Sequence, residues 1–141
     1  MDHLILPRHI YHTILNSIGA APCESGGVLA MKENKISDFY YDLHAGVNNR
    51  FYIPSVSDIT TQVNGWLAEG MRFCGFIHSH RWPYRNLSAM DIVAAEKTMA
   101  ANQMNFLYMA IVCGRELYFY KVVRQPGKPQ SVLEPCSVQV K

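Results

Sequence analysis

The chain has 141 residues, of which 49% are hydrophobic and 17% are charged, and its formal net charge is +2. This is the composition of a globular protein, and the length suits one domain with a substantial core. The 13 lysines and arginines are scattered, which argues against a nucleic-acid partner, and no run approaches the roughly 20 apolar residues of a membrane span, which argues against a membrane partner.

Hydrophobic periodicity predicts a helix, a β-hairpin and a second helix in the first half of the chain. In chain order these are a helix from about Pro7 to Gly19, strands over residues 24–31 and 36–44 joined by a turn at residues 33–35, and a helix over residues 55–69. Proline is a favoured first-turn residue, and glycine commonly ends a helix, so both boundaries of the first helix have a physical cause.

The second half predicts strands on either side of a third helix. These are a strand over residues 71–80, an irregular loop over residues 81–87, a helix that begins at Ser88, strands over residues 105–113 and 116–123, and an edge strand near residues 137–140. The continuous apolar run at residues 105–113 is typical of a central strand that is covered on both faces.

Together these elements predict an α/β fold, in which helices sandwich a mixed β-sheet. We expect a single domain over residues 1–141. Its core should comprise about residues 7–124, followed by a tail at residues 125–141 whose first residues include Pro126, Gly127 and Pro129.

Four cysteines, Cys23, Cys74, Cys113 and Cys136, lie far apart and form no CxxC pair. Cysteines in apolar strands are usually buried as free thiols, so disulfides are not expected. The first residues of the chain lack the basic start and the long apolar run of a signal peptide. We therefore expect a cytoplasmic protein in a reducing compartment.

The residues with the clearest chemistry are His78, His80 and Asp91. In a strand, side chains at positions i and i+2 point to the same face, so the two imidazoles should lie side by side. The following loop is long enough to bring Asp91, in the first turn of the next helix, over the strand end. Two histidines and one carboxylate suit one zinc ion per chain, and three protein ligands leave a fourth position for water, as in catalytic sites. Zinc would lower the pKa of that water to about 7.

Each part of this pattern also has a purely structural interpretation. A His-x-His at a strand end is often only a pair of polar residues beside a loop. Ser88 and Asp91 have the spacing of a capping box, with serine as the N-cap and the acid at N3. Capping and metal binding are compatible, because a hydroxyl has both donor and acceptor capacity and Asp91 can also offer a carboxylate oxygen to a metal.

Five residues in order and spacing resemble the signature of the JAB/MPN family, the JAMM metalloproteases. Glu24 opens the first apolar strand, and His78, His80, Ser88 and Asp91 follow at the family's spacing. The resemblance is to small prokaryotic members, and it implies their cytidine-deaminase-like architecture. It also implies that the two histidines and the aspartate bind zinc. Glu24 would then transfer a proton from water to the leaving amine, and Ser88 would help to stabilise the oxyanion.

The resemblance covers about residues 7–124, including the segment at residues 48–54, and has two departures. Family members usually have proline directly after the second histidine and often before the serine, whereas this chain has Arg81 and Leu87. Neither residue is a ligand, but the loop's shape and substrate contacts should differ. This loop also carries Arg81, Trp82, Tyr84 and Arg85. It is either an ordinary solvated loop or a recognition surface for an acidic or extended partner.

The resemblance implies a zinc-dependent isopeptidase or peptidase. Its substrate would be a ubiquitin-like or sulfur-carrier protein cut after a diglycine-type C-terminal tail, which the family holds extended against a strand edge. An E1-like activating enzyme would then belong to the same pathway.

Three other functions compete with this one. A non-catalytic MPN scaffold that only binds partners would usually lack one or more ligands, and all five positions are intact here. A DNA-repair-associated branch carries His-Asn-His-Pro-Ser-Gly, which differs from the sequence that follows His78. A cysteine protease using Cys74 and His78 is the third, although nothing marks the thiol as activated.

Overall fold

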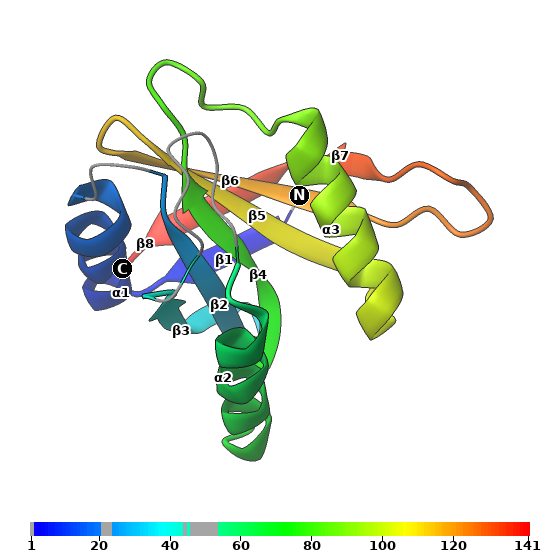
Figure 1. Ribbon diagram of the computed structural model, residues 1–141, viewed down its shortest axis with the longest axis horizontal. Helices are drawn as coiled ribbons and strands as arrows, with labels where there is room; N and C mark the ends of the chain where they lie inside the picture. The colour runs from blue at the N-terminus through cyan, green and yellow to red at the C-terminus, as the bar shows by residue number, and fades with distance from the viewer. Residues whose placement is uncertain (1, 21–23, 44, 46–53) are drawn as a thin grey trace.

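The structure is a computed structural model that describes residues 2–20, 24–43, 45 and 54–141 (Figure 1). The N-terminal part contains β1 (Asp2–Leu6), α1 (Arg8–Ser17), the 3₁₀ turn η1 (Ile18–Ala20), β2 (Gly26–Lys32), β3 (Lys35–Tyr41) and α2 (Val56–Ala68). The C-terminal part contains β4 (Arg72–Ser79), α3 (Ala89–Asn102), β5 (Phe106–Cys113), β6 (Glu116–Val123), β7 (Val132–Glu134) and β8 (Cys136–Val140).

Every helix and strand expected from the sequence is present, with boundaries shifted by at most a few residues. Left-handed residues occur at two of the turns: Glu33 (φ 58°) between β2 and β3, and Gly70 (φ 80°) after α2, where glycine adopts this conformation without strain. Two strands, β1 and β7, were not expected. Both are too short for periodicity to reveal, and the pairing partners of β1 are β3 and β8, which lie far away in the sequence.

The strands form one mixed sheet in the order β7-β6-β5-β4-β2-β3-β1-β8. Pairing is parallel between β1 and β3, β1 and β8, and β4 and β5, and antiparallel elsewhere. Because β6 also approaches β8 near the other end of this order, the sheet curls until it nearly closes into a barrel.

Side chains from every strand except β7 meet inside this curve. Leu29, Ile77 and Ala110 lie there, and helix α1 adds Ile10 and Ile14 to the same core. The terminal strands also contribute, which extends the core beyond the expected residues 7–124 at both ends. Burying these apolar side chains is the main favourable term in folding.

Helices α2 and α3 pack on the outer face of the sheet, away from α1 (Figure 1). Trp66 of α2 is 1% exposed and packs on Val28 and Ala30 of β2. Ala95 and Met99 of α3 pack with buried residues of β5 and β6. Helices therefore cover both faces, as expected, but the sheet between them is strongly curved rather than a flat layer.

A β-bulge in β4 decides which of its side chains reach each face. The register pairs Leu29 with Gly75 and Ala30 with Phe73, which leaves Cys74 as the extra residue. Cys74 and Ile77 consequently belong to the inner core, while Phe76 packs with the outer clusters. The strand therefore presents its outer face to α2 and α3 just before it reaches the histidines.

The described cysteines carry no disulfide, as expected: Cys74 and Cys113 are buried and free, and Cys136 is half-buried and free. Cys23 lies outside the described residues. Among the helices that the structure describes, none is long and apolar enough to cross a membrane.

Candidate metal centre

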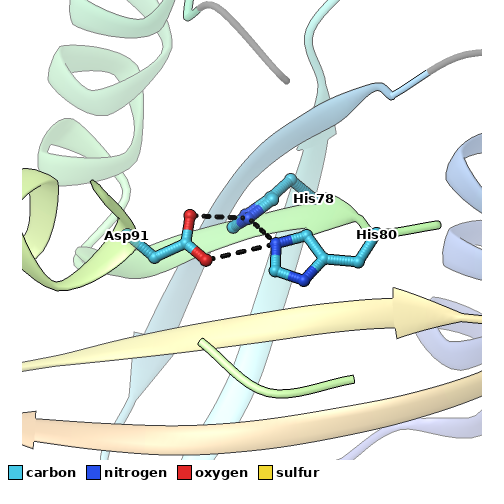
Figure 2. Close-up of side chains that lie close together, drawn as sticks. All are labelled: His78, His80 and Asp91. Atoms are coloured by element: carbon cyan, nitrogen blue, oxygen red, sulfur yellow. Dashed lines mark hydrogen bonds and ion pairs between the residues drawn. The ribbon is translucent and has the colours of Figure 1, made fainter. Parts of the chain in front are cut away.

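His78 lies at the end of β4, and His80 directly follows the strand, before the loop at residues 81–87. Because the two residues alternate with Ser79, their rings lie on one face of the sheet, with centroids 4.8 Å apart. The Nε2 atoms face each other across 3.0 Å (Figure 2). The expected pairing of the two imidazoles is therefore present.

Asp91 reaches the same point from the first turn of α3 (Figure 2). Its Oδ1 lies 3.0 Å from Nε2 of His78, and its Oδ2 lies 3.1 Å from Nε2 of His80. The side chains are 7%, 11% and 14% exposed for His78, His80 and Asp91, so the cluster is shielded but still open to solvent on one side.

The spacing of these atoms fits a metal ion. One ligand atom from each residue lies within 4.8 Å of the others. Nitrogen and oxygen ligands about 2.0–2.1 Å from a tetrahedral zinc are roughly 3.3 Å apart, close to the observed 3.0 and 3.1 Å separations. His78, His80 and Asp91 can therefore bind a metal ion.

The hydrogen bonds of His80 determine which of its nitrogens faces the cluster. Nδ1 lies 2.9 Å from the backbone carbonyl oxygen of Tyr84, which can only accept, so Nδ1 carries the proton. In the neutral ring, Nε2 then presents a lone pair toward His78 and Asp91. A lone pair and a carboxylate directed at one point repel each other unless a proton or a metal ion lies between them.

The pKa values of the cluster follow from the same contacts. Burial opposes ionisation of Asp91, but the hydrogen bonds from His78 and His80 outweigh it and hold the pKa of this carboxyl well below its usual range. The hydrogen bond to Asp91 in turn raises the pKa of His80 above its ordinary value, against the opposing effect of burial. Without a metal, a proton shared with His80 supplies the positive charge.

Ser88 and Asp91 form the capping box that their spacing predicts. The hydroxyl of Ser88 accepts the backbone N–H of Asp91 at 3.1 Å, and Oδ2 of Asp91 accepts the backbone N–H of Ser88 at 2.8 Å. Capping and a position in the cluster are therefore compatible, because the carboxylate that caps α3 also faces the histidines.

Glu24 lies across the β2–β4 pair from the histidines. Gly26 pairs with His78, and the backbone N–H of Ser79 donates to the carbonyl of Ser25 at 2.9 Å, so the register continues to place Glu24 opposite His80. Burial raises the pKa of Glu24, and the nearby His80 and His78 partly offset this rise. A carboxyl with a raised pKa beside the cluster has the property required of a proton-transfer group.

All five residues singled out in the sequence line one cleft of about 1030 Å³. Its other walls come from the loop at residues 81–87 and from the first turns of α3. Trp82, Tyr84 and Met90 are 63%, 68% and 67% exposed there, which forms an apolar rim with Arg81 and Arg85 beside it. The segment at residues 48–54, part of the family resemblance, falls outside the described residues except for Pro54, which lines the cleft.

The structure argues against Cys74 as a nucleophile. Cys74 is 1% exposed and belongs to the inner core, on the other side of the sheet from His78. Burial raises the pKa of its thiol, which keeps it protonated and unreactive.

Sequence reasoning missed the carbonyl of Tyr84 as the partner of His80. Every residue offers a backbone carbonyl, so no side-chain pattern marks this one, and only the path of the loop reveals it.

Comparisons with known proteins match the fold. AF2198, a JAB1/MPN domain protein from Archaeoglobus fulgidus, aligns with a TM-score of 0.54 and 20% sequence identity over 96% of this chain and 98% of that one. The chain has a JAB/MPN-like fold. The solution structure of protein DSY2949 from Desulfitobacterium hafniense aligns with a TM-score of 0.67 and 16% identity over 98% of this chain and 94% of that one. No family model and no curated protein sequence matches.

The JAB/MPN-like fold agrees with the family fold that the five-residue signature implied. The His78, His80 and Asp91 cluster adds a possible metal site at the place where the signature predicted one. At these identities the similarity concerns the fold, and the cytidine-deaminase-like detail stays a prediction.

Proposed function

We propose that the protein is a zinc-dependent JAMM-type peptidase or isopeptidase. Its substrate would be a ubiquitin-like or sulfur-carrier protein, cut after a diglycine-type C-terminal tail. The observation that carries the proposal is the convergence of His78, His80 and Asp91 in a cleft that Glu24 and Ser88 also line. This is the arrangement of a metal held by three protein ligands with proton-transfer and hydrogen-bonding groups beside it.

The three ligand residues would hold zinc through the Nε2 atoms of His78 and His80 and the carboxylate of Asp91. When bound, zinc would supply Lewis-acid activation of water and of the scissile carbonyl group. The chain's own contribution is to fix the ligands: Tyr84 orients His80, and the backbone N–H of Ser88 holds the carboxylate of Asp91.

Glu24 would accept a proton from the attacking water and return it to the leaving amine, which suits a carboxyl whose pKa is raised by burial. Ser88 would act as a hydrogen-bond donor through its hydroxyl group. Because the hydroxyl accepts the N–H of Asp91 for capping, its own proton remains available to donate toward a developing oxyanion.

The position of the cleft against β4 favours a slim, extended substrate segment. A scissile bond placed between Glu24 and Ser88 must approach the strand that carries the histidines, and glycines on its acyl side would avoid a clash there. The rest of the cleft wall, away from the scissile bond, includes the exposed Trp82 and Tyr84 and the cations Arg81 and Arg85. They could contact the folded body of the substrate, where aromatic and arginine side chains often dominate binding.

The test is a panel of ubiquitin-like and sulfur-carrier fusions in which a reporter follows the Gly-Gly tail. The zinc-loaded protein should cut after the second glycine, and a zinc chelator should stop the reaction. The matched control replaces the last glycine with a bulky residue, which should abolish cutting. Equal cutting of both series would contradict the diglycine preference.

No cutting of any fusion by zinc-loaded protein would instead favour the partner-binding MPN scaffold. An E1-like activating enzyme as a further partner is a separate proposal. Copurification of this chain with such an enzyme and a small protein ending in Gly-Gly would support it.

A further inference from the structure

The loop at residues 81–87 is fastened to the sheet at three points. The ring of Trp82 lies against Gly114 in the β5–β6 turn, so close that a Cβ there would be 3.0 Å from the indole. Leu87 packs with the outer cluster beneath α3. Between them, the hydroxyl of Tyr120 on β6 donates to the backbone carbonyl of Arg85 at 2.7 Å and lies 3.2 Å from Oδ1 of Asn86.

The middle attachment is next to the carbonyl that orients His80. Tyr84 O accepts the Nδ1 proton of His80, and the carbonyl of the following residue, Arg85, accepts the hydroxyl proton of Tyr120. The two carbonyls belong to successive planar peptide units that share the Arg85 Cα, so fixing the second limits the first to the positions that φ and ψ of Arg85 allow. The Tyr84 side chain cannot do this itself, since it is 68% exposed.

Tyr120 is well placed to hold this loop. It pairs with Met109 of β5, which in turn pairs with Phe76 of β4, so Tyr120 lies on the same outer face as the histidines, two strands away. Strand pairing fixes the backbone of Tyr120, whereas the turn contacts within the loop, Tyr84 N–H to Arg81 O and Arg85 N–H to Pro83 O, are only local.

We propose that Tyr120 is a positioning residue for the metal centre. Through the Arg85 carbonyl it fixes the Tyr84 carbonyl, which holds the His80 ring with Nε2 directed at His78 and Asp91. The inference rests on the metal site of the proposed function, but not on peptidase activity. Groups that orient a histidine ligand typically contribute 10- to 100-fold to metal affinity, and Tyr120 acts one peptide unit further away.

The experiment compares zinc affinity in the full chain and in Tyr120→Phe, which removes only the hydroxyl. Competition with a chromophoric chelator should show about a 10-fold weaker zinc Kd. The visible absorption of the Co²⁺-loaded protein should change in intensity or wavelength, because the His80 ligand is less well oriented. Trypsin should cut the metal-free variant faster after Arg85, since the loop is released from β6.

The matched control is Tyr118→Phe, on the same strand and the same face. Its hydroxyl bonds to Glu116 and also interacts with the Arg85 side chain, while its ring, which phenylalanine keeps, lies 6.0 Å from the Arg85 guanidinium carbon. Because Tyr118 contacts the Arg85 side chain and not its carbonyl, this variant should keep zinc affinity and the Co²⁺ spectrum near those of the unmodified chain. Asn86→Ala, which removes only the longer contact, should have a smaller effect than Tyr120→Phe.

An unchanged zinc Kd in Tyr120→Phe, with an unchanged Co²⁺ spectrum, would overturn the inference while leaving the metal site intact. Equal weakening in Tyr118→Phe would also overturn it, because a general loss of stability would then explain both. Failure of the unmodified chain to bind zinc would instead overturn the proposed function, and the inference with it.

Discussion

Ser88 and Asp91 hold each other at the start of α3, each accepting the other's backbone N–H, while both oxygens of the Asp91 carboxylate face the two histidines. The Asp91 side chain therefore caps the start of α3 and also completes the cluster. Because one side chain serves both roles, the start of α3 is coupled to the candidate metal site. Substitutions at Ser88 and at Asp91 can test the two roles separately.

Zinc binding should depend on all three cluster residues. We expect about one zinc per purified chain, and we expect His80→Ala and Asp91→Ala each to lose most of it, since two ligands bind zinc far less tightly than three. Elemental analysis measures the content. His12→Ala, on α1 away from the cleft, is the control and should keep its zinc. Full retention of zinc in both cluster variants would refute the ligand assignment.

Glu24→Gln should keep the fold and the zinc but lose activity by about 10²–10⁴-fold, because the amide cannot accept the proton from water. Turnover of a Gly-Gly fusion and zinc content should be measured on the same sample. Loss of the metal in this variant would make Glu24 a ligand and would contradict the division of roles proposed above.

Ser88→Ala should destabilise the protein by about 1 kcal/mol, because it removes the side chain that caps α3. For a chain of this size, that corresponds to a fall in Tm of roughly 2–4 °C. Ser55→Ala is a matched control, since Ser55 occupies the N-cap of α2 without capping a backbone N–H; its hydroxyl donates to Asp58 instead, and its loss should cost less. Equal shifts in the two variants would show that the capping box contributes no more than this side-chain bond.

The stabilisation that zinc provides should increase from pH 6 to pH 8. In the metal-free protein the bond to Asp91 raises the pKa of His80, so this ion pair adds stability at low pH that is lost as the pH rises through the raised value. Zinc binds only the deprotonated ligands, so its affinity changes in the opposite direction. Thermal melts with and without zinc should diverge as the pH rises, and a constant gap would contradict the prediction. His80→Ala should show little gap at any pH.

Trp82→Ala should lower kcat/KM for a folded fusion substrate by about 10-fold, mainly through KM, if the exposed ring contacts the substrate body. Zinc content should not change. Leu133→Ala provides the control, because this residue is 50% exposed on β7 and does not line the cleft. Equal effects of the two substitutions would show that the loop surface has no special part in binding.

The sequence by itself determined the local elements and the identity of the candidate metal-site residues. Periodicity located the helices and most strands, and the His-x-His alternation put two imidazoles on one face because strand side chains repeat every two residues. The Ser88 and Asp91 spacing likewise predicted the capping box, since both partners lie within one helical turn. These are short-range relationships, which geometry along the chain is enough to fix.

Only the tertiary structure decided how distant segments meet. The pairing of β1 with β8, the near-closure of the sheet and the bulge that turns Cys74 inward depend on contacts between segments far apart in the chain. The positions of Glu24 opposite His80 and of Tyr120 beneath the loop depend on strand register. Register is set by the combined burial of whole strands, because a shift of one residue would exchange the two faces.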